Sequence, residues 1–231
     1  MIPLANNSKT SQPTSNFSEI YRISPWLIAP LYPMAKYALL PLYFGSIQIT
    51  GREKIPTTGP VIIAPTHRSR WDAIIVSLAM GRLVSGRDLR FMVSADEMKG
   101  FQGWLVKRLG GFPVDLEHLG ISSFRYSVQL LTQGEMLVIF PEGGIYRDRA
   151  VHSLKEGLAR IALSVQSQEI DVKILPVSIN YSQPYPTWGT DICLDIGSPL
   201  NLADYSSGSG KKRAKQLTGD LKKTLSKLSQ L

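Results

Sequence analysis

The chain of 231 residues is long enough for one compact domain with a sizeable core and is short for two domains. Hydrophobic residues make up 43% of it and charged residues 19%, which excludes an intrinsically disordered chain. Its formal net charge of +8 indicates an anionic partner, and the classes to separate are nucleic acid, an anionic membrane and a phosphorylated substrate.

The first part of the chain divides into a polar leader and an apolar stretch. Residues 1–17 are polar and lack the charged and then apolar layout of a signal peptide. Residues 26–44 are rich in Trp, Leu, Tyr and Met, and their prolines argue against a straight membrane-spanning helix. We therefore predict two short helices in a membrane interface, with aromatic residues at its level: Trp26, Tyr32, Tyr37 and Tyr43. The alternative is that these helices simply cover the core of the domain.

From residue 46 onwards, segments with the pattern of strands alternate with segments with the pattern of helices. Strands are predicted over residues 46–50, 61–64, 89–94, 112–114, 136–140, 172–179 and 192–196. Helices are predicted over residues 71–80, 103–109, 121–131 and 154–165. This alternation is typical of a single α/β domain with a mixed, mostly parallel sheet flanked by helices.

The last part of the chain consists of a predicted linker and a basic helix. Residues 205–210 are rich in Ser and Gly, which is typical of a flexible linker. Residues 211–231 carry seven basic side chains against Asp220 alone, and an apolar face follows from leucines at helical spacing: Leu217, Leu221, Leu225 and Leu228. Such a helix could bind anionic lipid, pack back on the domain or touch nucleic acid. No nucleic-acid-binding motif accompanies it, so we expect no nucleic-acid partner.

Residues with metal-binding or redox chemistry are few. Cys193 is the only cysteine, so an internal disulfide is impossible and a reducing compartment is expected. It lies in an alternating strand pattern beside acidic residues that disfavour a thiolate, and we interpret it as a packing residue. The histidines His67, His118 and His152 have no metal-ligand spacing, and we expect no metal site.

The first candidate for chemistry is His67, which follows a predicted buried strand and precedes a predicted helix. The carboxyl ends of strands are where α/β sheets place ligand sites. Asp72 lies five residues further on, in the first turn of the helix. If the loop folds back, the Asp72 carboxylate accepts a hydrogen bond from one imidazole nitrogen and directs the other toward a substrate hydroxyl. Taken alone, this spacing also suits a surface histidine and a helix-start aspartate.

The second candidate is the segment Phe140-Pro141-Glu142-Gly143-Gly144, again at the end of a predicted buried strand. Its glycines permit a tight turn whose backbone amides could hold a phosphate or an oxyanion. Arg147 and Arg149 follow directly and are available to an anionic headgroup. A third candidate is Pro176, which interrupts an apolar strand. Because proline is confined to edges and bulges, we expect this strand to line a rim or groove.

In this order, these segments resemble the sequence blocks of the glycerolipid acyltransferase family, and in particular its 1-acylglycerol-3-phosphate (lysophosphatidic acid) acyltransferase branch. His67 and Asp72 match the family's Asn-His-x4-Asp block, with Thr66 in place of the Asn. The other three blocks are resembled by Gly110 to Asp115, by Phe140 to Gly143 and by Leu175-Pro176-Val177. The resemblance covers roughly residues 46–198.

Two arginines of the family pattern are absent. Leu116 replaces the arginine of the second block, and Gly144-Ile145 replaces the Thr-Arg of the third. In the family these arginines are associated with the phosphate of the acceptor. Arg70, Arg147 or Arg149 could take their place, or the acceptor carries a different headgroup.

The resemblance implies direct acyl transfer, in which His67, held by Asp72, is the base that takes the proton of the acceptor hydroxyl. We expect substrate contacts from a further set of residues: Arg70, Phe140, Pro141, Glu142, Gly143, Arg147 and Pro176. The expected reaction converts lysophosphatidic acid to phosphatidic acid in phospholipid synthesis. It uses no bound cofactor, and the co-substrate is acyl-acyl carrier protein or acyl-coenzyme A.

The expected partners are the lipid acceptor, the acyl donor and an anionic membrane surface, with the protein peripheral or monotopic on a reducing, cytoplasmic-type side. The predicted organisation is a leader and interfacial helical segment over 1–45, an acyltransferase domain over 46–204, and a linker and basic helix over 205–231. Three alternatives stay open. They are a related acyltransferase with another lysolipid or a neutral lipid alcohol as acceptor, a hydrolase of acyl thioesters, and a catalytically idle membrane-binding module.

Overall fold

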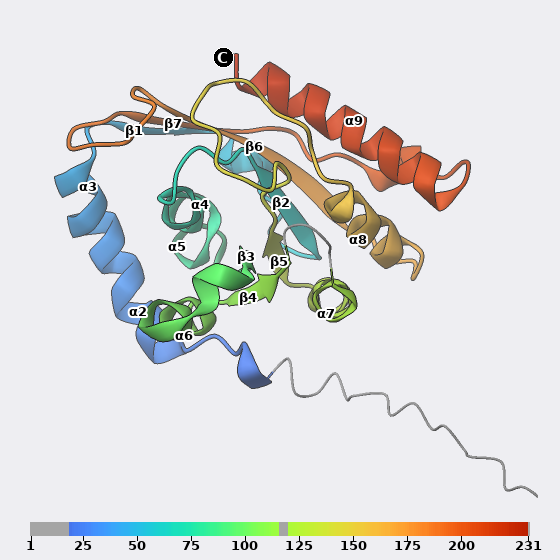
Figure 1. Cartoon of the computed structure of the whole chain (residues 1–231), viewed down its shortest axis with the longest axis horizontal. Helices are drawn as coiled ribbons and strands as arrows, with labels where there is room; N and C mark the ends of the chain where they lie inside the picture. Colours follow the sequence, from blue (N-terminus) through green and yellow to red (C-terminus); the bar gives the residue numbers. More distant parts are fainter. Residues whose placement is uncertain (1–18, 116–119, 231) are drawn as a thin grey trace, which may run out of the picture.

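The structure, a computed structural model that describes residues 19–115 and 120–230, is built around a twisted sheet (Figure 1). Within these residues the sheet has the strand order β1-β7-β6-β2-β5-β3-β4. The strands are β1 (Ile47–Thr50), β2 (Val61–Pro65), β3 (Leu89–Ser94), β4 (Gly111–Val114), β5 (Met136–Val138), β6 (Lys173–Tyr181) and β7 (Ile192–Ile196). Each neighbouring pair is parallel except β6 and β7, which are antiparallel. The predicted α/β domain with a mixed, mostly parallel sheet is therefore confirmed.

Helices cover both faces of this sheet, as the predicted alternation requires (Figure 1). They are α2 (Pro25–Met34), α3 (Leu40–Tyr43), α4 (Asp72–Met80), α5 (Arg82–Ser85), α6 (Gly100–Arg108), α7 (Ile121–Thr132), α8 (Gly157–Gln166) and α9 (Gly210–Leu228). A π-helical turn (Ala35–Leu39) joins α2 to α3, and 3-10 turns lie at Arg52–Lys54, Ala95–Met98 and Leu202–Tyr205. Leu116, which stands in place of the second-block arginine, and His118 lie outside the described residues.

The central strand β2 shows why the sheet needs cover on both faces. Successive side chains of a strand point to opposite faces, and those of β2 are fully buried on both. Ile62 and Ala64 belong to the apolar cluster that includes α7, α8 and α9. Val61 and Ile63 belong to the other cluster, which includes α4 and residues at the end of the N-terminal helices. Burial on both faces explains the uninterrupted apolar sequence of this strand.

The basic C-terminal helix packs back on the domain. In α9 Leu217 and Leu225 are fully buried, Leu221 is 2% exposed and Leu228 is half-buried. The buried leucines contact α8 and β6 and complete the cluster on that face of the sheet. The Ser209 side chain accepts a hydrogen bond from the Lys212 amide and so caps the start of the helix. Of the alternatives left by the sequence, the structure selects packing on the domain.

The N-terminal apolar stretch forms two short helices, α2 and α3, which the π-helical turn joins into one continuous helical run. The run continues from Pro25 to Tyr43 without a break, because the π-helical turn absorbs the disturbance that proline causes. Pro41 has no N–H, and its ring would meet the carbonyl four residues back. Within the wider turn, the Leu40 N–H instead donates to the Ala35 carbonyl, five residues back.

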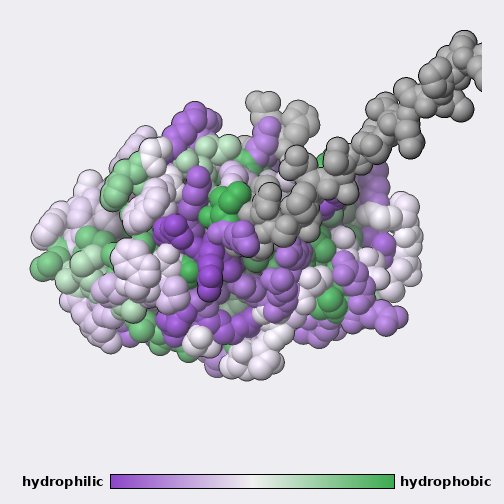
Figure 2. Space-filling view, turned by 90° about the horizontal axis from the view of Figure 1, so that it is seen from below, coloured by the Kyte–Doolittle hydropathy of each residue, from purple (hydrophilic) through white to green (hydrophobic). Residues whose placement is uncertain are grey.

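Part of this helical run faces the domain and part of it faces solvent. Ile28 and Leu40 are buried, whereas Trp26, Tyr37 and Leu42 are exposed. Figure 2 shows hydrophobic residues spread over the left part of the molecule, on the side where α2 and α3 lie in Figure 1. Within the described residues, every helix is too short or too polar to cross a membrane.

Pro176 does not lie on an edge strand, and the expectation that its strand lines a rim was wrong. β6 is interior, between β7 and β2. Val177 pairs with Ile196 in the antiparallel ladder, whereas Ile174 bridges to Leu200, so one extra residue is inserted on the β7 side. Pro176 sits at this bulge, where the regular ladder is interrupted and its missing N–H is tolerated.

Replacement of Leu221 by Ala tests the packing of α9. The substitution leaves a cavity among buried leucines, and we expect it to lower the free energy of unfolding by about 2–5 kcal/mol. The control Lys222→Ala, at the next and exposed position, should change it by less than about 0.5 kcal/mol. Urea unfolding followed by circular dichroism measures both, and equal stability of the two variants would show that α9 is detached in solution.

Candidate active site

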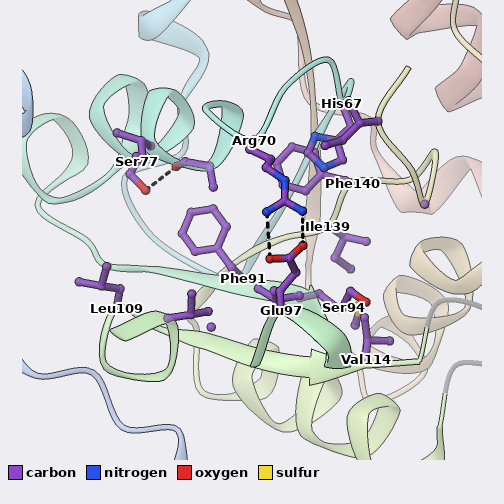
Figure 3. Close-up of a pocket in the computed structure, with 18 of the residues that line it drawn as sticks. His67, Arg70, Ser77, Phe91, Ser94, Glu97, Leu109, Val114, Ile139 and Phe140 are labelled. Atoms are coloured by element: carbon purple, nitrogen blue, oxygen red, sulfur yellow. Dashed lines mark hydrogen bonds and ion pairs between the residues drawn. The ribbon is translucent and has the colours of Figure 1, made fainter. Parts of the chain in front are cut away.

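Two segments that the sequence singled out meet at one edge of the sheet. β2 ends at Pro65 and leads into the loop that carries His67, while β5 ends at Val138 and leads into the turn that carries Phe140 to Gly143. The two strands are parallel neighbours, so their carboxyl ends lie together. The rings of His67 and Phe140 are consequently stacked, with their centroids 4.0 Å apart (Figure 3).

His67 and Asp72 form a hydrogen-bonded pair. The distance from His67 Nδ1 to Asp72 Oδ2 is 2.9 Å. The Asp72 side chain is fully buried, whereas that of His67 is 20% exposed. Because a carboxylate only accepts, the Nδ1–H of His67 donates to it, and Nε2 is left with its lone pair on the pocket side. This arrangement suits a general base.

Asp72 is held by more than the histidine. Its Oδ2 also accepts hydrogen bonds from the amides of Arg68 at 2.6 Å and Ser69 at 2.9 Å. Its Oδ1 accepts one from the Tyr181 hydroxyl at 2.6 Å. Asp72 is also the first residue of α4, where the helix dipole favours a negative charge. The loop from Arg68 to Asp72 therefore folds around its own carboxylate, which fixes the orientation of His67.

Tyr181 was missed by the sequence analysis. It is the last residue of β6, which runs parallel to β2 and so delivers Tyr181 to the same edge of the sheet. Burial, and then the negative charge of Asp72, raise the pKa of the Tyr181 hydroxyl far above its usual range. The hydroxyl stays protonated and always donates. A tyrosine that ends an apolar strand parallel to the histidine strand is the signal that could have found it.

A buried ion pair between Arg68 and Glu142 holds the same loop in place. Glu142 Oε2 accepts from Arg68 Nη1 at 2.8 Å and from the His67 amide at 2.9 Å, and Oε1 accepts from the His152 amide at 3.0 Å. Arg68 also donates from Nη2 to the Ala150 carbonyl at 3.1 Å. Both side chains of the pair are almost completely buried. Glu142 thus ties the histidine loop to two other segments, and Arg68 is a second functional residue that the sequence analysis did not identify.

A large pocket of about 1390 Å³ opens beside His67. One part of it is apolar and lies between the N-terminal helical run, α4, β3 and α6 (Figure 3). Its lining residues include Leu31, Leu39, Ile74, Leu78, Phe91, Val93, Leu105 and Val106. The volume exceeds that of typical small-molecule pockets and suits a long apolar chain whose end lies at His67.

The rest of the pocket wall carries charged groups. Arg70 forms a two-point ion pair with Glu97, with Nη2 to Oε1 at 2.7 Å and Nη1 to Oε2 at 3.3 Å, and this pair lies across the pocket (Figure 3). Farther along the wall are Lys155, Arg160 and Lys211. A Cβ built on Gly143 would lie 3.3 Å from Cγ and Cε of Lys155, so this lysine covers the glycine turn.

The residues expected to contact a substrate divide into two groups. Arg70, Phe140, Pro141 and Gly143 line the pocket, as His67 does. Three others do not line it: Glu142, Arg147 and Pro176. Glu142 accepts a hydrogen bond from the His67 amide, behind the pocket wall. Arg147 lies over the ring of Tyr185 at 4.6 Å, and Pro176 is inside the sheet. Glu142 is a support for the site rather than a contact surface.

Most backbone amides near His67 already donate hydrogen bonds within the protein. Those of residues 67, 68 and 69 donate to Glu142 or Asp72, and the Gly143 amide donates to the Phe140 carbonyl. Gly144 and Ile145 also line the pocket, and among the described residues their amides have no hydrogen-bond partner. These two N–H groups are therefore the candidates for an oxyanion site.

Within residues 19–115 and 120–230, no cluster of three or more His, Cys, Asp or Glu side chains could hold a metal ion. Cys193 lies on β7 outside the pocket, where burial and the neighbouring Asp195 raise the pKa of its thiol. Its interpretation as a packing residue agrees with this position.

Comparison with known proteins places these features in a family. The sequence model described as Acyltransferase matches residues 46–180, which is more than half of the chain. A 1-acyl-sn-glycerol-3-phosphate acyltransferase of Bacillus subtilis is 27% identical over 191 residues, which are 80% of this chain and 88% of that protein. One of Streptococcus pneumoniae is 26% identical over 168 residues, covering 69% of this chain and 58% of that protein.

A solved structure has a similar fold. It is the 1-acyl-sn-glycerophosphate (LPA) acyltransferase PlsC from Thermotoga maritima, with a TM-score of 0.63 and 22% sequence identity. The match covers 87% of this chain and 79% of that chain. At this identity the likeness supports the α/β fold and the order of its elements.

The Tyr181→Phe variant tests the support of Asp72. Without the hydroxyl, Asp72 Oδ1 loses its hydrogen bond, and the carboxylate is held less firmly against His67. We expect kcat/KM to fall by about two- to tenfold, because one buried hydrogen bond is lost while the His67–Asp72 pair remains. The control is Tyr205→Phe, which removes a hydroxyl bonded to Asp220 away from the pocket. An unchanged kcat/KM of Tyr181→Phe would show that Tyr181 does not support Asp72.

The Glu142→Gln variant tests the buried ion pair. It leaves the Arg68 charge buried without a counter-ion, and we expect the free energy of unfolding to fall by about 3–5 kcal/mol. The control Asp171→Asn breaks the more exposed pair with Lys173 and should cost less than about 1 kcal/mol. If both variants lose the same stability in urea, Glu142 is not the support that its contacts indicate.

Proposed function

Since the chain belongs to the acyltransferase family, we propose that it transfers a fatty acyl group from a thioester donor to the free hydroxyl of lysophosphatidic acid, giving phosphatidic acid. The names of the relatives from Bacillus subtilis and Streptococcus pneumoniae support this acceptor. The observation that carries the proposal is the His67–Asp72 pair, whose free nitrogen lies at the wall of a pocket wide enough for an acyl chain.

The reaction begins with proton removal from the acceptor. His67 Nε2 takes the proton of the lipid hydroxyl as its oxygen attacks the thioester carbonyl, and the buried Asp72 carboxylate stabilises the imidazolium that forms. The tetrahedral oxyanion accepts hydrogen bonds from the Gly144 and Ile145 amides at the pocket wall. The C–S bond then breaks, and His67 returns its proton to the departing thiolate. The products are the ester and the free thiol, with no acyl-enzyme.

The two substrates occupy different parts of the pocket. The apolar part between the N-terminal helical run, α4 and α6 holds the fatty acyl chain, because water-excluding side chains line it. The thioester is that of acyl carrier protein or coenzyme A. Arg70 faces Glu97 across this space and orders the wall where the chain meets the reacting carbonyl.

Lys155 is the best candidate for the acceptor phosphate. The family's third-block arginine is absent here, and Arg147 and Arg149 do not line the pocket. Lys155 does line it, covers the Gly143 turn and has no ion-pair partner among the described residues. A single lysine is a weaker phosphate ligand than two arginines. Another lysolipid or a neutral lipid alcohol is therefore the second candidate acceptor.

The N-terminal helical run is the proposed contact with the membrane. Its exposed side chains Trp26, Met34, Tyr37, Leu39 and Leu42 are large and apolar or aromatic, as in interfacial helices. The same run supplies one wall of the acyl pocket, so a lipid could enter without crossing water. This arrangement fits a peripheral or monotopic protein on an anionic membrane surface.

Release of free thiol from palmitoyl-coenzyme A, measured in phospholipid vesicles, tests the function. We expect release that depends on lysophosphatidic acid and that falls by about 10²–10⁴-fold in His67→Ala. His152→Ala is the matched control, because His152 forms a similar pair with Asp148 outside the pocket. Near-normal turnover by His67→Ala would refute the assignment of the base.

The acceptors in the same assay separate the alternatives. Release driven only by lysophosphatidylcholine or monoacylglycerol would show that the protein transfers acyl groups but uses a different acceptor. Release without any acceptor would indicate a thioester hydrolase. No release from any donor, with vesicle binding intact, would indicate an inactive membrane-binding module.

A further inference from the structure

Helix α9 presents a continuous basic surface. The lysines on its exposed side are Lys211, Lys212, Lys215, Lys222, Lys223 and Lys227, and we call them the lysine face. One ion pair is found on this face, from Lys223 to Asp220 at 3.2 Å. The remaining exposed positions between the lysines are small or uncharged, such as Gln216 and Gly219. A surface with this excess of one charge favours an acidic partner.

The lysine face has no free apolar side that could insert into a membrane. An interfacial helix inserts its apolar side into the lipid, but Leu217, Leu221 and Leu225 of α9 are already buried in the cluster shared with α8 and β6. None of the exposed large hydrophobic side chains belongs to α9, whereas Trp26, Tyr37 and Leu42 belong to the N-terminal run. The run and α9 pack on opposite faces of the sheet (Figure 1). The lysine face therefore points away from the surface that we assign to the membrane.

The lysine face begins at the pocket. Lys211, in the first turn of α9, lines the pocket together with Lys155 and Arg160. The charged part of the pocket thus continues onto the outer surface of the helix. A partner that sits on α9 is placed to deliver a group into the pocket toward His67.

We propose that the lysine face docks an acidic acyl carrier protein, whose thioester-bearing arm enters the pocket past Lys211. This inference rests on the proposed acyltransferase function and names its donor. The 19-residue helix is about 28 Å long, so its lysines extend well beyond the pocket end. Coenzyme A bound in the pocket would leave the distal lysines Lys222, Lys223 and Lys227 without a contact. A folded acidic partner reaches the whole face.

Charge reversal on the helix tests the docking. The variant carries Lys212→Glu, Lys215→Glu and Lys222→Glu, which lie outside the pocket and have no ion pairs within the described chain. The control carries Arg22→Glu, Arg52→Glu and Arg125→Glu, exposed positions outside α9 with the same change in net charge. Circular dichroism melting confirms that both variants fold. Transfer to lysophosphatidic acid in phosphatidylcholine vesicles is measured with palmitoyl-acyl carrier protein and with palmitoyl-coenzyme A.

We expect the α9 variant to lose at least about tenfold in kcat/KM with the carrier protein and less than twofold with coenzyme A. Added salt should likewise lower the kcat/KM of the wild type with the carrier protein. The control variant should behave like the wild type. Equal kcat/KM of the wild type and the α9 variant with the carrier overturns the proposal. So does a loss of binding to anionic vesicles without any loss toward the carrier, which would identify a membrane partner instead.

A separate binding measurement distinguishes failure of the docking from failure of the function. Fluorescence anisotropy of labelled holo-acyl carrier protein reports binding without turnover. If neither donor is turned over, the acyltransferase function fails, but weaker binding by the α9 variant than by the wild type still supports the docking. If coenzyme A is used and the carrier protein neither binds nor reacts, the function stands and the docking proposal is refuted.

Discussion

The fully buried carboxylate of Asp72 is the constraint on which the site depends. A charged group without access to water is stable only if hydrogen-bond donors surround it, and here His67, Arg68, Ser69 and Tyr181 supply them. These donors come from one loop and from the end of another strand. The loop conformation, the ring orientation of His67 and the edge of the sheet are therefore linked through a single carboxylate.

The two faces of the sheet carry different kinds of surface. One face carries α4 and the N-terminal helical run, whose exposed aromatic side chains and apolar pocket wall suit a lipid. The other face carries α7, α8 and α9, and the exposed side of α9 is basic. The pocket at the carboxyl edge of the strands reaches both sides. His67 is thus accessible through one pocket from both the apolar and the basic side of the domain.

Patterns local in the sequence predicted much of this structure, whereas contacts between distant segments were missed. Each strand or helix pattern, and the five-residue spacing of His67 and Asp72, depends only on residues that are close together in the sequence. Tyr181 contacts Asp72 across 109 positions and Arg68 contacts Glu142 across 74, and neither pairing leaves a local pattern. The sequence left an edge and a bulge open for Pro176, because the extra residue that forms the bulge belongs to the partner strand.

The central claim, that Asp72 holds His67 with Nε2 free, is tested most directly by nitrogen-15 NMR of histidine-labelled protein. Comparison with His67→Gln assigns the His67 ring, and the nitrogen shifts report which nitrogen carries the proton at neutral pH. The account predicts the Nδ1–H tautomer in the wild type, because Asp72 Oδ2 lies 2.9 Å from Nδ1. A ring protonated on Nε2 instead would contradict it, since His67 would then have no lone pair to offer the acceptor hydroxyl.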